Sequence, residues 1–492
     1  MKSAKKVLIG SSLLIGQSLS TKLIGLVSTL ILARVLVPED FGLVAIATLC
    51  LGFVEVLSKT GSMQYLISVD EINDSIVNSA WTLDFIIKIP LAIIFAISAP
   101  LIAKFYGDDR LIAIIYTLSF MFLLQCIATP AESLLRREQK FYPLVKLGVL
   151  SKIISVTVAV TLALGLKSYW ALILGQFVSA IISTLGSYLI HSHRPRFTLI
   201  NIKDQWKFSS WMIPQSVVGF FRTQLDTLIV SATSGQNVLG AYHIMKYLAY
   251  IPSAHIILPA TEPLLVELRK ARQNTKNFSD QFNISFIVTM AVALPIVSII
   301  YVHHRLIVSF LLGSQWVDYS MLLAIFGFTV LAMAFFQQAQ RVLLIYGKTK
   351  QIFYYEVTTF IGLYSVLFFV GVEDIFIFSM FRVGIDTIAS LSIFIYIAIK
   401  YTGLSNFLHL ASATIPIVLA STAGALLSNE VENLTPFDFI NLAIVFSVFF
   451  STFVLTIIAL YILGPAKKIE FLYLRNIIIK LFNALRKRLV KD

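Results

Sequence analysis

The chain has 492 residues, of which 58% are hydrophobic and 13% are charged, and its formal net charge is +13. Soluble proteins carry about 25% charged residues, and one soluble core cannot bury so much apolar surface, whereas a bilayer can. The composition excludes an ordinary soluble protein and predicts an all-α polytopic membrane protein. A net positive charge favours nucleic acid as the partner of a soluble protein, but the loop charges described below account for it. No nucleic-acid partner is therefore expected.

Fourteen apolar segments follow one another, and each is long enough to cross about 30 Å of hydrocarbon, which takes roughly 20 residues. The first follows Lys2, Lys5 and Lys6 and continues to Leu36 without a small-residue cleavage site, so we expect a retained helix and not a signal peptide. The predicted transmembrane helices cover residues 7–36, 41–68, 76–103, 111–136, 142–165, 168–191, 206–233, 237–266, 281–302, 317–346, 350–371, 374–401, 407–429 and 437–463.

Lysine and arginine residues outside these helices lie mostly on one side of the predicted bundle. With a cytoplasmic N-terminus, the cytoplasmic tails and loops hold 25 of them and the opposite side holds 5. Cytoplasmic loops of membrane proteins carry an excess of these residues. We therefore expect both termini in the cytoplasm, and this asymmetry explains most of the basic charge.

A weak internal repeat divides the chain. The first predicted helix ends before the motif PEDFG at 38–42, and the seventh ends before QNVLG at 236–240, at an offset of 198 positions. The repeat predicts two six-helix lobes with a site at their interface, which is a common plan of transporters. We expect a first lobe, a cytoplasmic linker, a second lobe, an added helix pair and a basic tail, over residues 1–192, 193–205, 206–401, 402–465 and 466–492.

The basic tail at 466–492 has its own pattern. Apolar residues recur three or four positions apart, and lysine and arginine residues occupy much of the remainder. The pattern is typical of an amphipathic helix on the anionic inner leaflet. A helix docked on the cytoplasmic ends of the bundle is the alternative.

At least nine lysine and arginine side chains lie inside the predicted helices. A cation at the centre of a membrane helix costs about 2.5–3.5 kcal/mol on insertion scales. So many buried cations predict a water-filled cavity, and the natural ligand of a cationic cavity is an anion. Away from the helix ends, these residues are Lys22, Lys59, Lys88, Lys146, Lys152, Lys246, Arg222, Arg341 and Arg382.

Four of these cations have a carboxylate one helical turn away, a spacing that allows direct pairing. The pairs are Glu55–Lys59, Asp84–Lys88, Arg222–Asp226 and Arg382–Asp386. For the second and fourth pairs, a purely structural role between helices is an equal alternative to a role in the cavity.

Lys22 lies near the middle of its helix, and the repeat offset places it close to Arg222 of the other lobe. We expect these two residues to face each other across a central cavity and to bind the substrate. Glu262 and Glu356 are candidates for carrying a proton or binding Na⁺, or for a hydrogen bond to a neighbouring helix. Glu55 and Asp226 are candidates for coupling or for pairing.

Signals of catalysis and of cofactor binding do not occur in the sequence. It has no nucleotide-binding phosphate loop, no His-Glu-x-x-His motif and no evident nucleophile–base arrangement. Cys50 and Cys126 both lie in apolar segments, which indicates neither a disulfide framework nor a thiolate metal site. We expect a transporter and not an enzyme, with no cofactor and no metal site.

Three motifs carry a family resemblance. The segment from Leu32 to Ala45 resembles the first loop of Wzx-type polysaccharide flippases, and more narrowly of their WzxC-like lipopolysaccharide biosynthesis branch. Gly240-Ala241-Tyr242 is similar to that family's start of helix 8, and LLGSQW at 311–316 is similar to its motif before helix 10. The similarity runs over about residues 5–465 and includes the number of predicted helices.

The resemblance implies membership of the multidrug/oligosaccharidyl-lipid/polysaccharide exporter superfamily, with two six-helix lobes in a V shape. It implies a flippase of the bacterial cytoplasmic (inner) membrane that moves an undecaprenyl-pyrophosphate-linked oligosaccharide by alternating access, for O-antigen, capsule or exopolysaccharide synthesis. Membrane lipids and a polysaccharide polymerase are the implied partners. Related flippases hold the pyrophosphate with cations on helices 1, 2 and 8, where this chain has Lys22, Lys59 and Lys246.

Lysine in place of the family's frequent arginine favours a point-charge attraction over a bidentate clamp. Two other functions are weighed against the flippase. A multidrug/cation antiporter of the same superfamily predicts acidic residues in the cavity, which the excess of cations disfavours. A membrane-embedded glycan polymerase or ligase predicts a large external loop, and the longest external connection, at about residues 303–316, is short.

Overall fold

The computed structural model describes residues 2–69, 71–200, 202–432, 434–435 and 438–463, and within them every regular element is a helix. The predicted amphipathic helix of the tail, at 466–492, lies outside the described residues. Contacts within the chain define two compact units, residues 1–243 and 244–492, and each is described by itself. The predicted lobe boundaries near residue 200 stay a prediction.

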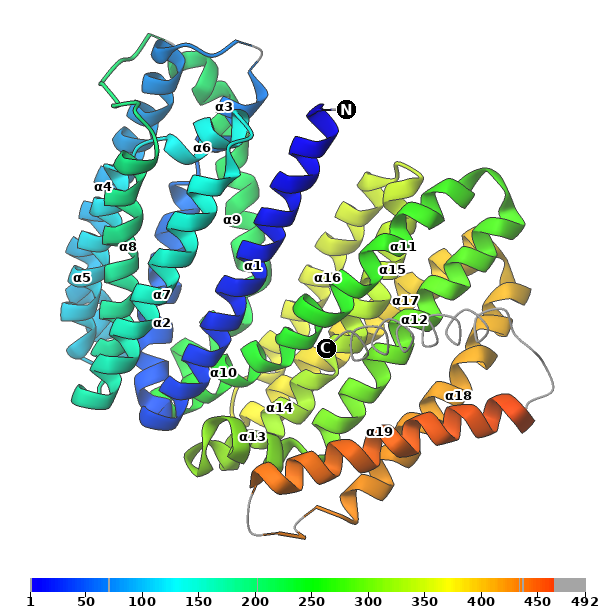
Figure 1. The fold of residues 1–492 in the computed structure, drawn as a ribbon. Helices are drawn as coiled ribbons and strands as arrows, with labels where there is room; N and C mark the ends of the chain where they lie inside the picture. Colours follow the sequence, from blue (N-terminus) through cyan, green and yellow to red (C-terminus); the bar gives the residue numbers. More distant parts are fainter. Residues whose placement is uncertain (1, 70, 201, 433, 436–437, 464–492) are drawn as a thin grey trace, which may run out of the picture. The chain divides into compact units, whose positions relative to one another are not determined.

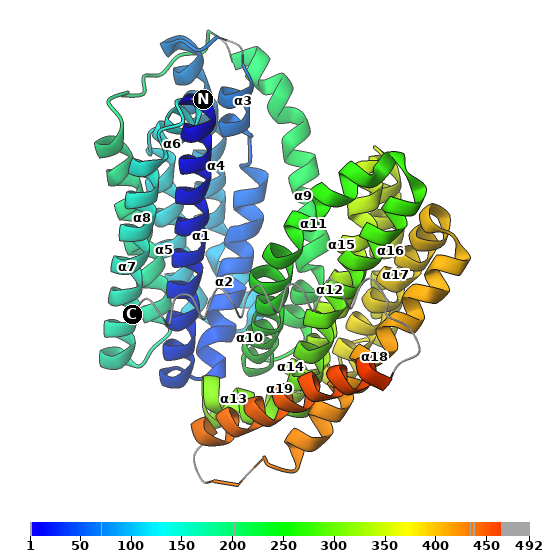
Figure 2. The same ribbon diagram turned by 45° about the vertical axis from the view of Figure 1, so that its right-hand side comes forward.

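The first unit consists of long helices with two short ones at one end (Figures 1 and 2). Its packing centres on α7, which lies against both α1 and α8, and on the α4–α5 pair. The helices are α1 (Lys2–Val35), α2 (Pro38–Leu57), α3 (Ser62–Ser68), α4 (Asp74–Tyr106), α5 (Arg110–Cys126), α6 (Ala131–Arg137), α7 (Phe141–Leu166), α8 (Trp170–Ile190), α9 (Ile202–Thr233) and the first turns of α10 (Gln236–Pro252).

Small residues let α7 and α8 approach closely, as is usual for helices packed in a membrane. A Cβ at Gly175 of α8 would lie 2.7 Å from the Cβ of Ala159 in α7. The Ser155 hydroxyl of α7 donates to the Gly175 carbonyl at 2.8 Å, and the hydroxyls of Ser151 and Ser179 are 3.0 Å apart. These contacts make α7–α8 a firmly packed pair within the unit.

The second unit is built around α12, which contacts α11, α14, α15 and α18. On α12, Phe282 and Phe286 stack on Phe394 of α17, with ring centroids 6.0 Å and 4.4 Å apart. The helices are the remainder of α10, a π-helical turn (Ser253–Ile257), α11 (Leu258–Lys270), α12 (Thr275–Val302), α13 (His304–Leu312), α14 (Ser320–Gly327), α15 (Thr329–Ile345), α16 (Thr349–Val370), α17 (Ile375–Thr402), α18 (Leu404–Asn429) and α19 (Asp438–Leu463).

Eleven helices of the described chain are long and apolar enough to cross a membrane, or twelve if the bent pair α5–α6 is one span. The long helix α9 and the run from α10 to α11 are not among them. Polar residues explain this for α9, which carries Lys203, Asp204, Lys207, Arg222 and Asp226. A multi-pass helical membrane protein is therefore confirmed, and the number fourteen stays a prediction.

Three predicted helices are interrupted, which corrects their expected bounds, and the one predicted at 317–346 breaks at Phe328 between α14 and α15. The span predicted at 41–68 stops at Leu57 and resumes at Ser62, with Gly61 in the left-handed region at φ 71°. The span predicted at 111–136 bends by 47° between α5 and α6, where Pro130 precedes the new helix. Glycine adopts positive φ without strain, and proline lacks the N–H that would continue a helix.

The two repeat motifs meet where α2 and α10 begin. A Cβ at Gly42 would lie 1.9 Å from the Gln236 carbonyl oxygen, and a Cβ at Gly240 would lie 1.9 Å from the Pro38 carbonyl oxygen. The offset of 198 relates Gly42 to Gly240 and Pro38 to Gln236, so the two contacts are equivalent, which is the reciprocal pattern of a two-fold relation. This crossing of two helix starts supports the repeat offset of 198 read from the sequence.

An arginine ties the same region together from the α4–α5 turn. Arg110 Nη2 lies 2.6 Å from Glu39, 2.7 Å from Asp108 and 3.0 Å from Gln236, so it joins the starts of α2, α5 and α10. The Arg110 guanidinium lowers the pKa of Asp108 to about 2, with a further contribution from Gln236. The carboxylate therefore stays charged, and the contact stays formed, across the physiological pH range.

Candidate functional site

The break between α2 and α3 carries one of the predicted cations. Lys59 lies within residues 58–61, beyond the end of α2, and its side chain is exposed. The predicted i,i+4 pair Glu55–Lys59 is therefore wrong, because the helix that would align the two side chains stops at Leu57. The described structure contains no ion pair between them. Interrupted helices are common at the substrate sites of transporters.

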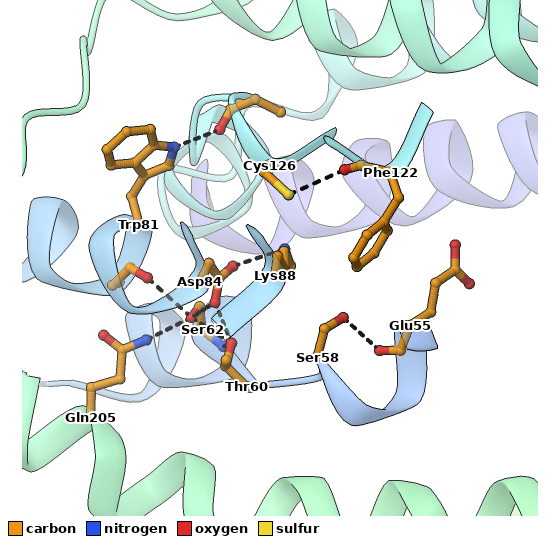
Figure 3. Close-up of polar contacts among 12 residues, drawn as sticks. Glu55, Ser58, Thr60, Ser62, Trp81, Asp84, Lys88, Phe122, Cys126 and Gln205 are labelled. Atoms are coloured by element: carbon orange, nitrogen blue, oxygen red, sulfur yellow. Dashed lines mark hydrogen bonds and ion pairs between the residues drawn. The ribbon is translucent and has the colours of Figure 1, made fainter. Parts of the chain in front are cut away.

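A carboxylate on α4 holds this break in place (Figure 3). Asp84 accepts hydrogen bonds from the hydroxyls of Thr60 and Ser62, and the Lys88 ammonium lies 3.2 Å from its second oxygen. Gln205, at the start of α9 and fully buried, donates to the Ser62 hydroxyl at 2.6 Å. Thr60 and Ser62, which follow Lys59, are thus tied to α4, and Ser62 is also tied to α9.

These bonds favour one of the two roles considered for a predicted pair. Asp84–Lys88 is formed, and its carboxylate is occupied by the break, which favours the structural alternative for this pair. Arg382–Asp386 in the second unit is also formed, at 3.4 Å.

Lys59 lines a hollow of about 420 Å³ between α2 and α9, which we call the polar pocket. Its α9 wall carries the uncharged polar side chains of Gln215, Ser216, Thr223 and Gln224. The pocket therefore combines one ammonium group with several hydroxyl and amide groups. Such a surface suits an anion that also has hydroxyl groups, because lysine supplies charge and three donors while the amides and hydroxyls donate and accept.

The other predicted cations lie elsewhere. Lys22 is exposed on α1, and Arg222 is exposed on α9, next to Thr223 of the polar pocket. Neither residue is among the described residues that line this pocket. Lys246 is half-buried on α10 in the second unit. The joint cavity predicted for these residues stays a prediction.

The predicted carboxylates have different surroundings. Asp226 on α9 is fully buried and accepts hydrogen bonds from the Tyr242 hydroxyl at 3.0 Å and the Thr227 amide at 2.8 Å, so it fastens α10 to α9. Glu55 is exposed on α2, and Glu356 is half-buried on α16. The side chain of Glu262 lies outside the described residues.

The polar wall of α9 was not anticipated from the sequence, although a signal for it exists. Ser216, Gly219 and Thr223 recur at helical spacing inside a segment predicted to span the membrane. A stripe of small and polar residues on one face indicates a helix that faces a hydrated space. Gln205 gives no comparable signal, because its partner Ser62 is 143 positions away.

The hydrogen bonds at Asp84 make a testable contribution to stability. Replacing Asp84 by alanine leaves Thr60, Ser62 and Lys88 without their acceptor, and we expect a loss of about 2 kcal/mol, since hydrogen bonds to charged groups contribute about 1.5–3 kcal/mol. Thermal unfolding of the purified protein in detergent measures the loss. Asp84→Asn, which keeps one acceptor oxygen, should lose less.

The exposed Asp109 of the α4–α5 turn provides the matched control. Asp109→Ala removes the same charge without touching the break, and its unfolding temperature should equal that of the unmodified protein. An Asp84→Ala protein that unfolds at the same temperature as the Asp109→Ala protein would contradict the structural role.

The fold defines the class as a multi-pass helical membrane protein with the architecture of known lipid and drug transporters. The structure of the lipid II flippase MurJ in an inward closed conformation superposes with a TM-score of 0.71 at 16% identity, over 91% of this chain and 99% of MurJ. An inward-facing multidrug resistance MATE family transporter of the MOP superfamily superposes with a TM-score of 0.53 at 11% identity, over 80% of this chain and 95% of its own.

The chain belongs to the family described as polysaccharide biosynthesis protein, whose model matches residues 31–321. It is 25% identical over 288 residues to the succinoglycan biosynthesis transport protein ExoT of Rhizobium meliloti, covering 58% of each chain. It is 24% identical over 267 residues to the lipopolysaccharide biosynthesis protein WzxC of Escherichia coli, covering 53% of this chain and 54% of WzxC. The resemblance to WzxC-like proteins is confirmed, and the matches span about half the length of these relatives.

Proposed function

We propose that the protein is a flippase that moves an undecaprenyl-pyrophosphate-linked oligosaccharide across the bacterial inner membrane. The observation that carries the proposal is the polar pocket, in which Lys59 stands at a break in a membrane-crossing helix and faces the hydroxyl and amide groups of α9. A pyrophosphate needs a cation, and a sugar needs groups that donate and accept hydrogen bonds. The family and the fold are compatible with this substrate.

In the proposed mechanism, fourteen helices form two six-helix lobes in a V shape plus an added pair, and the lobes rock about the bound head group. Lys59, Lys22, Arg222 and Lys246 neutralise the pyrophosphate, chiefly as point charges because three of the four are lysines. The oligosaccharide follows the pyrophosphate into the cavity, while the isoprenoid chain stays in apolar surroundings. The protein carries out no chemical step, and both termini are cytoplasmic.

The proposed coupling groups are Glu55, Glu262 and Glu356, while Asp226 acts as a pairing residue. Asp226 is assigned to pairing because its carboxylate is buried and accepts hydrogen bonds from Tyr242 and Thr227. Glu55 is exposed on the helix that leads to Lys59, so proton uptake there changes the charge next to the proposed site. A cation antiporter is disfavoured, because the polar pocket presents a lysine and no carboxylate among its described lining residues.

The proposal is tested by replacing Lys22 and Arg222 together with glutamine. Removing two cations from the cavity should abolish surface polysaccharide in the producing strain, because an anionic head group then loses most of its attraction. Immunoblots of membrane fractions check that the protein inserts, and surface polymer is measured by antibody or lectin binding.

The control variant carries Lys104→Gln and Lys167→Gln, two exposed lysines on the predicted external side. It loses the same charge and should make normal amounts of polymer. Normal polymer in the Lys22/Arg222 strain would contradict the cavity role of these cations.

A further inference from the structure

A second hollow of the first unit lies between α2, α4 and α9 and measures about 370 Å³. We call it the apolar groove, and its walls include Phe53, Leu57, Leu91, Phe220 and Phe221. The rings of Phe53, Phe220 and Phe221 pack together with centroids 5.7–5.9 Å apart. Carbon-rich side chains therefore dominate its surface.

The hydroxyl group of Ser98, on the α4 wall of the groove, already has a hydrogen-bond partner. The Ser98 hydroxyl donates to the Phe95 carbonyl at 2.7 Å within its own helix. A water molecule needs two to four polar partners to occupy a cavity, and an apolar cavity stays dry. A hollow far larger than one water molecule loses dispersion contacts along its whole lining when empty. Hydrocarbon is therefore the ligand that this groove fits.

The apolar groove adjoins the polar pocket. Phe220 belongs to the walls of both, and on α2 the neighbouring residues Val56 and Leu57 face the pocket and the groove, respectively. One ligand that fills both hollows must carry an anionic, hydrogen-bonding head for Lys59 and a long hydrocarbon chain for the aromatic wall.

The groove is accessible from the apolar surface of the unit. Ile94 lines the groove and is 61% exposed, and Ile97 and Leu101 on the same helix are each 70% exposed. These side chains belong to a helix that is long and apolar enough to cross a membrane. A hydrocarbon chain held in the groove therefore has a continuous apolar path along α4 into the bilayer.

We propose that the apolar groove binds the first isoprene units of the lipid carrier while the pyrophosphate lies in the polar pocket. The inference rests on the proposed function and adds the site of the lipid chain. An ordinary phospholipid is disfavoured, because its head group stays at the membrane surface, whereas Lys59 lies within the candidate membrane span from Pro38 to Leu66. Bulky, branched isoprene units also suit the aromatic wall better than a straight acyl chain.

Narrowing the groove tests the proposal. The full-length protein in phosphatidylethanolamine nanodiscs is titrated with undecaprenyl pyrophosphate and, separately, with inorganic pyrophosphate. Leu91→Trp fills the groove and should weaken binding of the lipid by about tenfold, since displacing one or two methylene-sized contacts costs that much. Binding of inorganic pyrophosphate should not change. Ile97→Trp, on the same helix but outside the groove lining, should affect neither probe.

The outcomes separate this inference from the proposed function. If Leu91→Trp binds the lipid as tightly as the unmodified protein while Lys59→Gln weakens both probes, the groove assignment is wrong and the proposed function stands. If the unmodified protein binds undecaprenyl pyrophosphate no more tightly than inorganic pyrophosphate, the groove contributes nothing and the inference is overturned.

A second measurement needs no variant. Farnesyl diphosphate with a diazirine on its second isoprene unit is photolysed with the unmodified protein, and the labelled peptides are identified by mass spectrometry. Labels should fall on the groove segments of α2, α4 and α9, and undecaprenyl pyrophosphate should displace them. Labels elsewhere, or equal displacement by phosphatidylglycerol, would show that the groove holds no carrier chain or only bulk lipid.

Discussion

Replacing Lys59 by glutamine is expected to lower the rate of surface polysaccharide production by about 10- to 100-fold, because a charge-assisted contact to a phosphate contributes about 1.5–3 kcal/mol. The side chain lines the polar pocket and has no described ion-pair partner, so its charge is available to a ligand. Polymer accumulation after induction of the gene in a deletion strain measures the rate.

Charge and shape at this position have separable effects. Lys59→Arg keeps the cation and should retain most of the activity, whereas Lys59→Glu should abolish it by repelling the pyrophosphate. Lys104→Gln, an exposed residue at the end of α4, is the control and should behave as the unmodified protein. Equal polymer production by Lys59→Gln and Lys104→Gln would remove Lys59 from the substrate site.

Adding a single methyl group at Gly240 should destabilise the protein by about 3 kcal/mol, the upper part of the range for overpacking. The added Cβ would meet the Pro38 carbonyl oxygen at 1.9 Å, and a backbone atom cannot rotate away as a side chain can. Gly42→Ala should cost a similar amount, because its Cβ would meet the Gln236 carbonyl at the same distance. Thermal unfolding in detergent and the amount of protein in the membrane measure the effect.

Because the two glycine contacts lie at the same crossing of α2 and α10, the effects of the two substitutions should depend on each other. Once one methyl group has separated α2 from α10, the second meets a widened gap, so Gly42→Ala and Gly240→Ala together should cost less than the sum of the two. Gly384→Ala on α17 is the control, because a Cβ there meets nothing within 4 Å. If the Gly240→Ala and Gly384→Ala proteins unfold at the same temperature, the crossing does not constrain the helices.

Local spacing predicted two ion pairs that each lie on one unbroken helix. Asp84–Lys88 and Arg382–Asp386 are formed because α4 and α17 continue through both residues of each pair. The same rule failed for Glu55 and Lys59. Residues 58–61 are Ser-Lys-Thr-Gly, a polar stretch inside the segment predicted as one helix, and Gly61 at its end adopts a positive φ.

The repeat motifs predicted some features of the structure and not others. The constant offset of 198 positions between the motifs predicted equivalent helix starts, and the glycine contacts of α2 and α10 agree with that prediction. The motifs did not indicate that the two glycines touch, because contact depends on how the helices cross. Similarly, the polar residues of α9 are visible in the sequence, whereas their place opposite Lys59 is not.

The amino-acid sequence alone was enough to assign the membrane environment, the helical class and the family, because composition, segment length and local motifs are properties of neighbouring residues. Tertiary structure decided which charges are available to a ligand. Asp84 is occupied by Thr60 and Ser62, Asp226 by Tyr242, and Lys59 faces a pocket. The physical reason is that burial and hydrogen bonding depend on partners distant in the chain, which close packing brings together and local periodicity does not encode.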